Sequence, residues 1–226
     1  NKINILKIYK QNNIFHAFTY AKKNNLAKWF IDGKDYFEDL AQKLMEARYT
    51  IFITDWWMSP EVFLLRPINE KFYLNMIKKK KIFMKPPTFK KLNPKSLVKR
   101  HPSTMTDLLW SHHEKLVIID QIIGYVGGID LCWGRYDTHA HPISEPHNMA
   151  GIYEYPFIDY ANERQSDFKE VQNYTQEMIS RKDNPRMPWH DIHCRIIGDS
   201  VLDIARHFVE RWNQVNNYQD DNKGII

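Results

Sequence analysis

Two hydrophobic periods follow one another in the first well-patterned part of the chain. Residues 28–31 form a short aromatic and apolar run that predicts a strand, and Asp32-Gly33 predicts a turn after it. The β-branched and aromatic run at residues 50–57 predicts a second, buried strand. Between these strands, apolar residues recur at helical spacing and predict an amphipathic helix: Tyr36, Leu40, Leu44 and Ala47. A strand, a helix and a strand at this spacing indicate helices packed on a sheet.

Similar signals return later, on both sides of a long polar segment. Residues 115–120 and 124–128 flank a short connection and predict a β-hairpin. Residues 138–186 are rich in His, Asn, Pro and Tyr, and we expect them to shape access to a site, with a helix near residues 167–181. The last predicted element is a helix over residues 200–212, with an apolar face made of Val201, Ile204, Ala205, Phe208 and Trp212. The predicted fold class is α/β, a mixed β-sheet flanked by helices.

Length and composition fit one globular lobe. The chain has 226 residues, of which 43% are hydrophobic and 14% aromatic, enough to build a core. Its apolar runs fall short of the roughly 20 residues needed to cross a bilayer. We place the lobe at residues 27–218, after a linker or domain tail at 1–26 and before a tail at 219–226. Because Asn1 stands where an initiator Met would, we expect a fragment of a longer protein.

The charge balance is basic. Thirty-two Lys and Arg against 27 Asp and Glu give a net charge of +5, which favours anionic partners such as phospholipid head groups or nucleic acid. Residues 72–100 are the most basic stretch, and both a solvated face and attraction to anionic lipid are open interpretations of it. Cys132 and Cys194 match no zinc or redox spacing, so we expect a reducing, cytosolic compartment. The basic stretch at residues 72–100 contains Lys78 to Lys81, Lys85, Lys90, Lys91, Lys95 and Lys99, interrupted by Pro86, Pro87 and Pro94.

The most specific chemical pattern is H-x-K-x-x-x-x-D, formed by His113, Lys115 and Asp120. On an extended strand His113 and Lys115 point to the same face, so both can touch one phosphate. A neutral imidazole can attack phosphorus, and a lysine can stabilise charge that develops on the phosphoryl oxygens. One histidine cannot be both the nucleophile and the acid that protonates the leaving alcohol. The chemistry therefore requires a second histidine on the opposite side of the phosphate.

Several neighbouring residues fit supporting roles. Asp120 has the other strand parity, which favours fixing the local loop over bond making. Gly127 and Gly128 remove side chains where the backbone must pass close to the site, and Asp130 can accept hydrogen bonds from a catalytic side chain. By spacing alone, a chance coincidence of such residues on a strand pair is an equally good interpretation.

Two further groups of residues are weaker candidates. His190, Asp191 and His193 could form a metal cluster, but on a strand the two histidines would face opposite ways, so packing is favoured and we expect no metal or cofactor. Trp56 and Trp57 are candidates for lining a lipid site, although adjacent strand residues face opposite sides and at least one is expected in the core. No role is assigned to the loop histidines His139, His141 and His147.

From residue 27 to residue 213 the sequence resembles the eukaryotic phospholipase D family in separated blocks that keep the family's order. Residues 112–121 are similar to the first catalytic motif of that family and residues 127–131 to the segment after it, which Arg135 and Asp137 continue. The other similar blocks are AKWF at 27–30, YFEDL at 36–40, IFITDWWMSPE at 51–61, PRMPWHDIH at 185–193 and DIARHFVERWN at 203–213.

This resemblance implies a phospholipase D-like α/β/α lobe and the hydrolysis of phosphatidylcholine to phosphatidic acid and choline. It further implies a phosphohistidine intermediate, no catalytic metal and transfer to primary alcohols through the same intermediate. His113 matches the motif histidine and Lys115 the phosphate-binding lysine, and whether His113 is the nucleophile or the general acid stays open. The implied partner is a phospholipid membrane surface, with phosphatidylcholine and anionic lipids, on the cytosolic face where the protein would be peripheral. Nucleic acid is the less expected partner.

The sequence departs from the family pattern in two ways. After residue 84 the family continues a strand and adds a helical segment, so an internal segment near residues 84–92 is expected to be missing. The chain also contains a single H-x-K-x-x-x-x-D motif, which makes it half an active site. Activity would then need a C-terminal catalytic half or a second copy. A nuclease or other phosphodiesterase of the same superfamily and an inactive interaction domain are the alternative interpretations.

Overall fold

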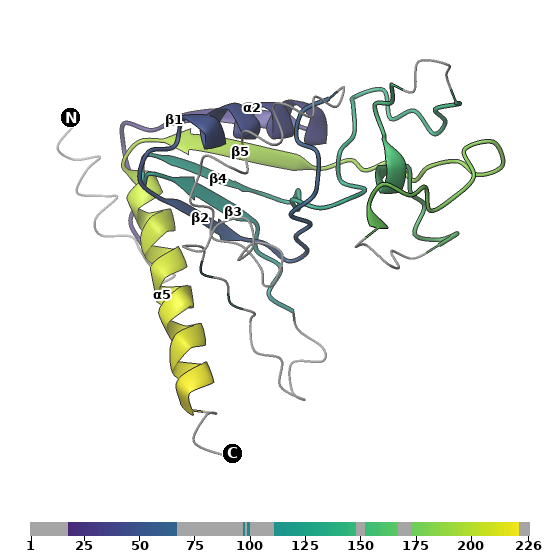
Figure 1. Ribbon diagram of the computed structural model, residues 1–226. Coiled ribbons are helices and arrows are strands. Elements are labelled where there is room, and N and C mark those ends of the chain that lie inside the picture. Colours follow the sequence, from purple (N-terminus) through teal and green to yellow (C-terminus); the bar gives the residue numbers. More distant parts are fainter. Residues whose placement is uncertain are drawn as a thin grey trace.

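A five-stranded sheet in the order β1-β5-β4-β3-β2 forms the centre of the computed structural model, which describes residues 18–66, 97, 99, 111–147, 152–166 and 173–221. All four pairings of these strands are antiparallel. One helix covers each face of the sheet (Figure 1). The elements are β1 (Leu26–Ile31), α2 (Gly33–Glu46), β2 (Ile51–Thr54), β3 (Leu116–Ile119), β4 (Ile123–Gly127), the 3-10 turn η2 (Phe157–Asp159), β5 (Ile192–Ile197) and α5 (Ser200–Asp221). The predicted α/β lobe is confirmed.

Alternation along β3 separates the two layers of the core. Val117 and Ile119 pack in the larger apolar cluster under α2, whereas Ile118 packs in a smaller cluster against α5. The spacing that predicted α2 is confirmed, because Tyr36, Leu40 and Leu44 are buried together with Phe37 and Ala41. On the other face Val201, Ala205 and Phe208 of α5 are buried, and Phe208 stacks on Phe52 with ring centroids 4.6 Å apart.

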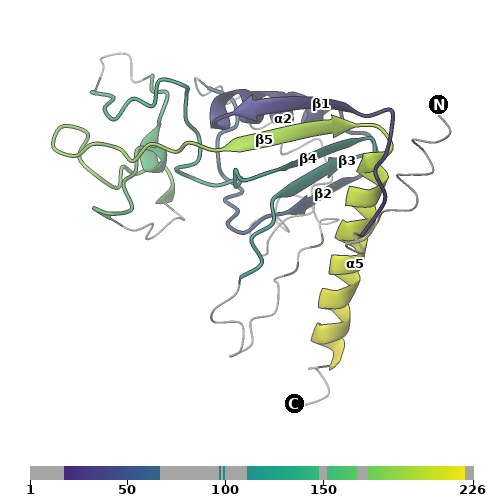
Figure 2. The same ribbon diagram turned by 180° about the vertical axis from the view of Figure 1, so that it is seen from behind.

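The described parts of residues 131–190, which are 131–147, 152–166 and 173–190, extend beyond one end of the sheet as a loop-rich unit that contains η2 (Figures 1 and 2). Its centre is the buried carboxylate of Asp137, which pairs with the guanidinium of Arg186 at 3.0 Å. The same carboxylate accepts hydrogen bonds from the Tyr155 hydroxyl at 2.9 Å and from the backbone N–H of Trp189 at 2.7 Å. Hydrogen bonds and an ion pair to this buried carboxylate therefore hold segments of the unit together where regular secondary structure is sparse.

The structure differs from the sequence expectations at two elements. β2 ends at Thr54 and not at residue 57, because the Asp55 carboxylate leaves the strand pairing and accepts the N–H of Leu131, after β4, at 2.7 Å. The helix expected near residues 167–181 is wrong over its described part: residues 173–181 form turns, held by the buried guanidinium of Arg181 on the Tyr155 carbonyl and on Glu145. Residues 167–172 lie outside the described range.

The first strand and the last helix both extend past their expected bounds. β1 begins at Leu26, and α5 continues to Asp221, well beyond the predicted end at residue 212. The expected internal deletion near residues 84–92 and nearly all of the basic stretch at 72–100 lie outside the described residues. Among the described helices, none is both long and apolar enough to cross a bilayer.

The hairpin between β3 and β4 is confirmed, and its turn depends on Asp120. Asp120 and Gln121 both have positive φ, of 52° and 56°, and the Ile122 N–H donates to the Ile119 carbonyl at 3.0 Å. Because these are not glycines, the left-handed turn needs support from its surroundings. The Asp120 carboxylate provides it by accepting three backbone N–H groups from the segment before β2, those of Arg48 (2.7 Å), Tyr49 (2.7 Å) and Thr50 (2.8 Å).

We expect Asp120→Ala to lower the free energy of unfolding by about 2 kcal/mol, because it leaves three backbone donors without their charged acceptor. Urea unfolding followed by circular dichroism measures the loss. The matched control is Glu38→Ala on the exposed side of α2, which should change stability by less than about 0.5 kcal/mol. Equal losses in the two variants would show that the three hydrogen bonds do not stabilise the turn.

Candidate active site

Strand direction brings the chemically interesting residues to one edge of the sheet. In the antiparallel order, β3 and β5 start at the edge where β1, β2 and β4 end. Three segments therefore meet at this edge: residues 113–115 before β3, residues 55–57 after β2 and residues 127–130 at the end of β4. The start of β5 lies next to them, because Gly127 pairs with His193.

Lys115 is the buried charge of this edge. Its side chain is only 3% exposed, and its Nζ lies 2.8 Å from Oδ1 of Asp130, whose side chain is 2% exposed. Asp130 also accepts the Trp57 N–H at 3.2 Å, and its second oxygen lies 3.7 Å from Nε of Arg135. A buried cation of this kind is tolerated only with an ionised partner, so Asp130 fixes both the charge and the position of Lys115.

Asp55 and Asp130 share this environment, and their pKa values shift in opposite directions. Burial, and then the hydrogen bond to Asp130, raise the pKa of Asp55 well above its usual value. Burial also acts to raise the pKa of Asp130, but hydrogen bonds from Asp55 and Lys115 outweigh it and lower that pKa overall. The environment therefore favours the acid form of Asp55 and the ionised form of Asp130, which pairs with Lys115.

His113 stands at the surface in front of this ion pair. His113 is exposed to solvent, and its ring lies against the indole of Trp56, with ring centroids 4.9 Å apart. The Lys115 Nζ lies 5.5 Å from the centroid of the same indole. The Trp56 indole thus lies next to both the solvent-accessible imidazole of His113 and the buried ammonium of Lys115. The expectation that one of Trp56 and Trp57 belongs to the core is wrong, because β2 has already ended and Trp56 is exposed while Trp57 is half-buried.

Gly127 and Gly128 let two strands approach closely beside this site. A Cβ on Gly127 would lie 2.6 Å from the His193 ring, and a Cβ on Gly128 would lie 2.2 Å from a carboxylate oxygen of Asp191. The Gly128 N–H instead donates to the Ile192 carbonyl at 2.9 Å. No side chain larger than hydrogen fits at these two positions without moving the backbone.

His193 fills the space behind the glycines. It is fully buried and stacks on Tyr36, with ring centroids 3.9 Å apart. Neither ring nitrogen has a hydrogen-bond partner among the residues that the structure describes. Burial, and then the charge of Lys115, lower the pKa of His193 to about 3, so the imidazole stays neutral. The packing role expected for His193 is confirmed.

A family model described as Phospholipase D matches residues 88–224, which is more than half of the chain and includes His113, Lys115 and Asp120. The chain belongs to the phospholipase D family. The resemblance seen in the sequence blocks is thereby confirmed. Relatives with this name agree with the assignment over most of the chain.

Three of these relatives come from different eukaryotes. Phospholipase D1 of Saccharomyces cerevisiae is 35% identical over 227 residues, covering 89% of this chain and 14% of the relative. Phospholipase D zeta 2 of Arabidopsis thaliana is 34% identical over 226 residues (88% and 21%), and Phospholipase D2 of Bos taurus is 32% identical over 242 residues (87% and 26%). The chain therefore spans between about a seventh and a quarter of the length of these relatives.

Among solved structures, NucT from Helicobacter pylori aligns with a TM-score of 0.43 and 11% identity, covering 84% of this chain and 97% of that one. This overlap is too weak to support a conclusion. The family assignment depends on the family model and on the sequence relatives alone.

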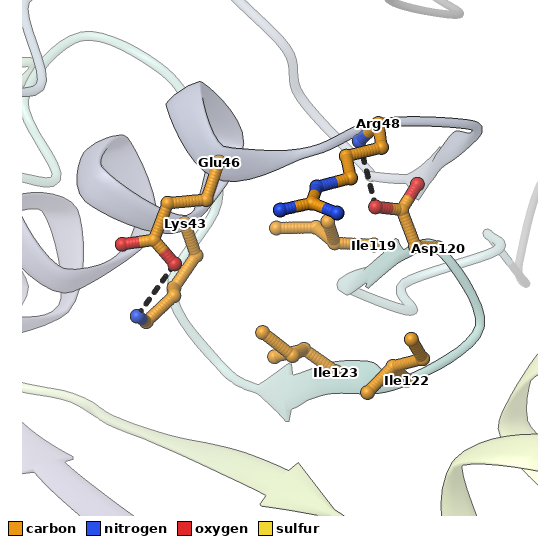
Figure 3. A pocket seen from close by; sticks show the side chains of 7 residues that line it. All are labelled: Lys43, Glu46, Arg48, Ile119, Asp120, Ile122 and Ile123. Carbon is orange, nitrogen blue, oxygen red and sulfur yellow. Dashed lines mark hydrogen bonds and ion pairs between the residues drawn. The ribbon is translucent and has the colours of Figure 1, made fainter.

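The acidic residue of the family motif does not reach the site. Asp120 follows the C-terminal end of β3, and seven extended residues from His113 would span roughly 23 Å. A pocket of about 420 Å³ lies at this opposite edge, lined by isoleucines and by charged side chains of the helix α2 end (Figure 3). Lys43 and Glu46 pair there at 2.8 Å, and Asp120 is occupied by backbone N–H groups. In this phospholipase D lobe the pocket and the catalytic candidates are therefore at different edges.

Asp55 and Arg135 are site residues to which the sequence analysis gave no role. Both lie outside the strands, Asp55 directly after β2 and Arg135 after β4, and only the fold brings them to Asp130. The Arg135 guanidinium also lies 3.7 Å from the centroid of the Trp189 indole and pairs with Glu163 at 3.2 Å. Arg135 thus connects the loop-rich unit to the Lys115 ion pair. A usable sequence signal was the position of Asp55 directly after a buried strand, where side chains of the sheet edge gather.

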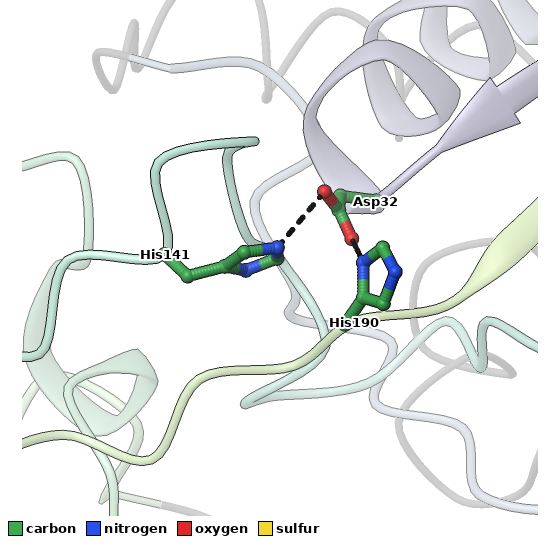
Figure 4. A group of neighbouring side chains, drawn as sticks. All are labelled: Asp32, His141 and His190. Atoms are coloured by element: carbon green, nitrogen blue, oxygen red, sulfur yellow. Dashed lines mark hydrogen bonds and ion pairs between the residues drawn. The ribbon is translucent and has the colours of Figure 1, made fainter.

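Among the described residues, His190 groups with Asp32 and His141 and not with Asp191 and His193, the grouping that the sequence analysis disfavoured. β5 begins at Ile192, so His190 lies before the strand and the strand-parity argument does not apply to it. Its Nδ1 lies 2.7 Å from Oδ1 of Asp32. The loop histidine His141, to which no role was given, lies on the other oxygen of the same carboxylate (Figure 4).

The neutral state of His193 predicts a pH dependence of stability. The pKa in the fold is about 3 and the ordinary value is 6.5, so the unfolded chain binds a proton that the folded chain does not below pH 6.5. Stability is complete above that pH and is lost as the pH falls. Between pH 7 and pH 5 we expect the wild type to lose about 2 kcal/mol more than His193→Phe, which can keep the stacking on Tyr36.

Urea unfolding of both proteins at the two pH values measures this difference, and the other titrating groups cancel in the comparison. The same pH dependence in the two proteins would mean that His193 is protonated in the folded state.

Proposed function

We propose that this chain is one catalytic half of a phospholipase D that hydrolyses phosphatidylcholine to phosphatidic acid and choline through a phosphohistidine intermediate. The observation that supports it most is the arrangement around Trp56: an exposed imidazole, His113, stands in front of a buried ammonium, Lys115, that Asp130 keeps charged. A nucleophile or acid that solvent can reach, next to a fixed cation, is what phosphodiester cleavage requires.

The proposed reaction uses two histidines, His113 and one from a second motif. An imidazole nitrogen attacks phosphorus and forms a P–N bond, while the bond from phosphorus to the choline oxygen breaks and its electron pair leaves on that oxygen. The other histidine, protonated, gives its proton to the leaving choline. It then takes a proton from water, whose oxygen attacks phosphorus and breaks the P–N bond. Either histidine can be the nucleophile in this scheme.

Lys115 supplies the electrostatic part of the mechanism. An ammonium has three N–H donors, and only one of them can point at Oδ1 of Asp130 in the ion pair. The remaining donors can stabilise the non-bridging phosphate oxygens, on which negative charge grows in the transition state. Asp130, with Asp55 and Arg135 around it, is a positioning group for this cation.

The second histidine is proposed to come from another H-x-K-x-x-x-x-D motif. The printed sequence contains one such motif, and the relatives are several times longer than this chain. A C-terminal half of a longer protein, or a second copy of this lobe, would place its motif against the edge at which His113 is exposed.

The proposed site of action is the cytosolic face of a phospholipid membrane, where the substrate is. The net charge of +5 supports attraction to anionic lipid, and Trp56 offers an exposed aromatic surface beside His113. Trp57 lies behind Trp56 in a T-shaped contact, with ring centroids 6.1 Å apart. We propose that Trp56 contacts the lipid substrate and that Trp57 supports it.

His113→Ala should abolish turnover. The assay contains phosphatidylcholine vesicles and a primary alcohol, because the phosphatidyl alcohol reports the covalent intermediate. We expect product only when a C-terminal half with the second motif is supplied, and a loss of at least about 1,000-fold with His113→Ala. His147→Ala, at an exposed histidine of the loop-rich unit, is the matched control and should keep full turnover.

Two results would contradict the proposal. Turnover that survives His113→Ala in the complemented sample would exclude His113 from the chemistry. No turnover in a folded, complemented wild-type sample would favour an inactive interaction domain. Cleavage of single-stranded DNA, with binding that weakens steeply with salt, would instead favour a nuclease of the same superfamily.

Charge reversal in the basic stretch tests the membrane partner separately. Lys78→Glu combined with Lys79→Glu and Lys80→Glu should weaken binding to vesicles that contain anionic lipid by at least about 100-fold, as measured by sedimentation, since each of the three basic residues near such a surface contributes roughly 1 kcal/mol. Binding to pure phosphatidylcholine vesicles should not change. Unchanged sedimentation with anionic vesicles would indicate that this stretch is a solvated face.

A further inference from the structure

We propose that Asp32, His141 and His190 form a binding site for a divalent transition metal, with Zn²⁺ as the expected ion. The three side chains come from separate segments: the end of β1, the loop after residue 137 and the segment before β5 (Figure 4). Their donor atoms all lie within 4.8 Å of one another. The site is separate from the phosphodiesterase chemistry and does not depend on it.

Asp32 presents both of its oxygens to the two histidines. The Oδ2 atom lies 3.3 Å from Nε2 of His141, and the Oδ1 atom lies 2.7 Å from Nδ1 of His190. The two imidazole rings are 5.1 Å apart and nearly perpendicular. Asp32 itself is 1% exposed and has a positive φ of 67°, a conformation that a non-glycine residue adopts only when its surroundings fix it.

Hydrogen bonding leaves this cluster incompletely satisfied. Within the described part of the chain, Oδ2 of Asp32 and Nδ1 of His141 are buried without a hydrogen bond, and Nδ1 faces Oδ2 of Asp137 at 3.3 Å without hydrogen-bond geometry. A buried carboxylate oxygen without a donor is costly, so its position against an imidazole nitrogen needs a further positive group. A divalent cation between Oδ2 of Asp32 and Nε2 of His141 would supply that charge.

The distances fit zinc coordination. Zinc binds imidazole nitrogen and carboxylate oxygen at about 2.0–2.2 Å, so two ligand atoms of a tetrahedral site lie about 3.3 Å apart. The Asp32–His141 pair already has this separation. His190 lies on the other oxygen: its Nδ1 is 2.7 Å from Oδ1, at hydrogen-bonding distance, and would leave this hydrogen bond to coordinate an ion at Oδ2. The His190 side chain is 69% exposed, so it can make this movement and leaves a fourth position open to water.

A second carboxylate stands where metal sites place one. The Nδ1 atom of His141 lies 3.3 Å from Oδ2 of Asp137. Histidine ligands commonly direct their non-coordinating N–H to a carboxylate, which fixes the tautomer and increases the basicity of the coordinating nitrogen. With Nδ1 facing Asp137, the Nε2 atom of His141 is the one free to bind metal. Asp137 is held in place by Arg186, Tyr155 and Trp189.

The ligand types favour zinc over calcium or magnesium. Two imidazole nitrogens and one carboxylate suit Zn²⁺ and similar transition ions, whereas Ca²⁺ and Mg²⁺ prefer oxygen ligands throughout. A bound ion would connect the β1–α2 junction with two segments of the loop-rich unit. The inferred role is therefore to fix that unit against the sheet, three strands away from the Lys115 ion pair.

The test is a competitive titration of the full chain, freed of metal by a chelator, with Zn²⁺ and a chromophoric zinc indicator. We expect one Zn²⁺ per chain. His141→Gln and His190→Gln should each weaken binding by at least about 100-fold, because even the loss of a residue behind a metal ligand costs 10- to 100-fold. His147→Gln, at a histidine with 64% of its side chain exposed and outside the cluster, should bind as the wild type does.

A second measurement does not depend on variants. Co²⁺ added to the metal-free wild type should give the intense visible absorption of a tetrahedral site, and Zn²⁺ should remove it. His113→Ala should bind Zn²⁺ like the wild type, which separates this site from the catalytic one. The proposal is overturned if His190→Gln and His147→Gln bind Zn²⁺ equally, or if Co²⁺ shows only the weak spectrum of the hydrated ion.

Discussion

The ion pair between Lys115 and Asp130 is the interaction on which the active edge depends. A lysine that is 3% exposed retains its charge only if an ionised carboxylate stands beside it, because an isolated buried charge costs several kcal/mol. Hydrogen bonds from Asp55 and Lys115 outweigh the effect of burial and lower the pKa of Asp130, which favours its ionised form. The backbone of residues 55–57 and the Arg135 guanidinium then take positions around the same carboxylate. The exposed placement of His113, beside Trp56, follows from this arrangement.

The two edges of the sheet have different tasks. At one edge, where β3 begins, Lys115 and Asp130 are paired and the imidazole of His113 remains accessible. At the other edge, the Asp120 carboxylate accepts the backbone N–H groups of residues 48–50 and stabilises a left-handed turn. The histidine and the aspartate of one sequence motif are thus separated by the length of β3, and the aspartate has a folding role.

Much of the layered fold was predictable from local pattern. The helical spacing of Tyr36, Leu40 and Leu44 and the apolar strands of the hairpin were confirmed, since burial on one face imposes the period of the element on the sequence. The predictions failed where long-range polar contacts replace the pattern. The turns at residues 173–181 depend on the buried Arg181, and the end of β2 depends on a hydrogen bond from Leu131 to Asp55. Neither partner can be identified from its own neighbourhood in the chain.

The α/β class, the family and the residues of the motif could all be inferred from the sequence, because spacing and residue type are properties of a single segment. Which of those residues contact one another depends on the fold. It separated Asp120 from His113, brought Asp55 and Arg135 to Asp130, and placed His190 with Asp32 and His141 while burying His193. Ion pairing, desolvation and hydrogen bonding act only between groups a few ångströms apart in space. The antiparallel order of the five strands sets which strand ends lie that close to one another.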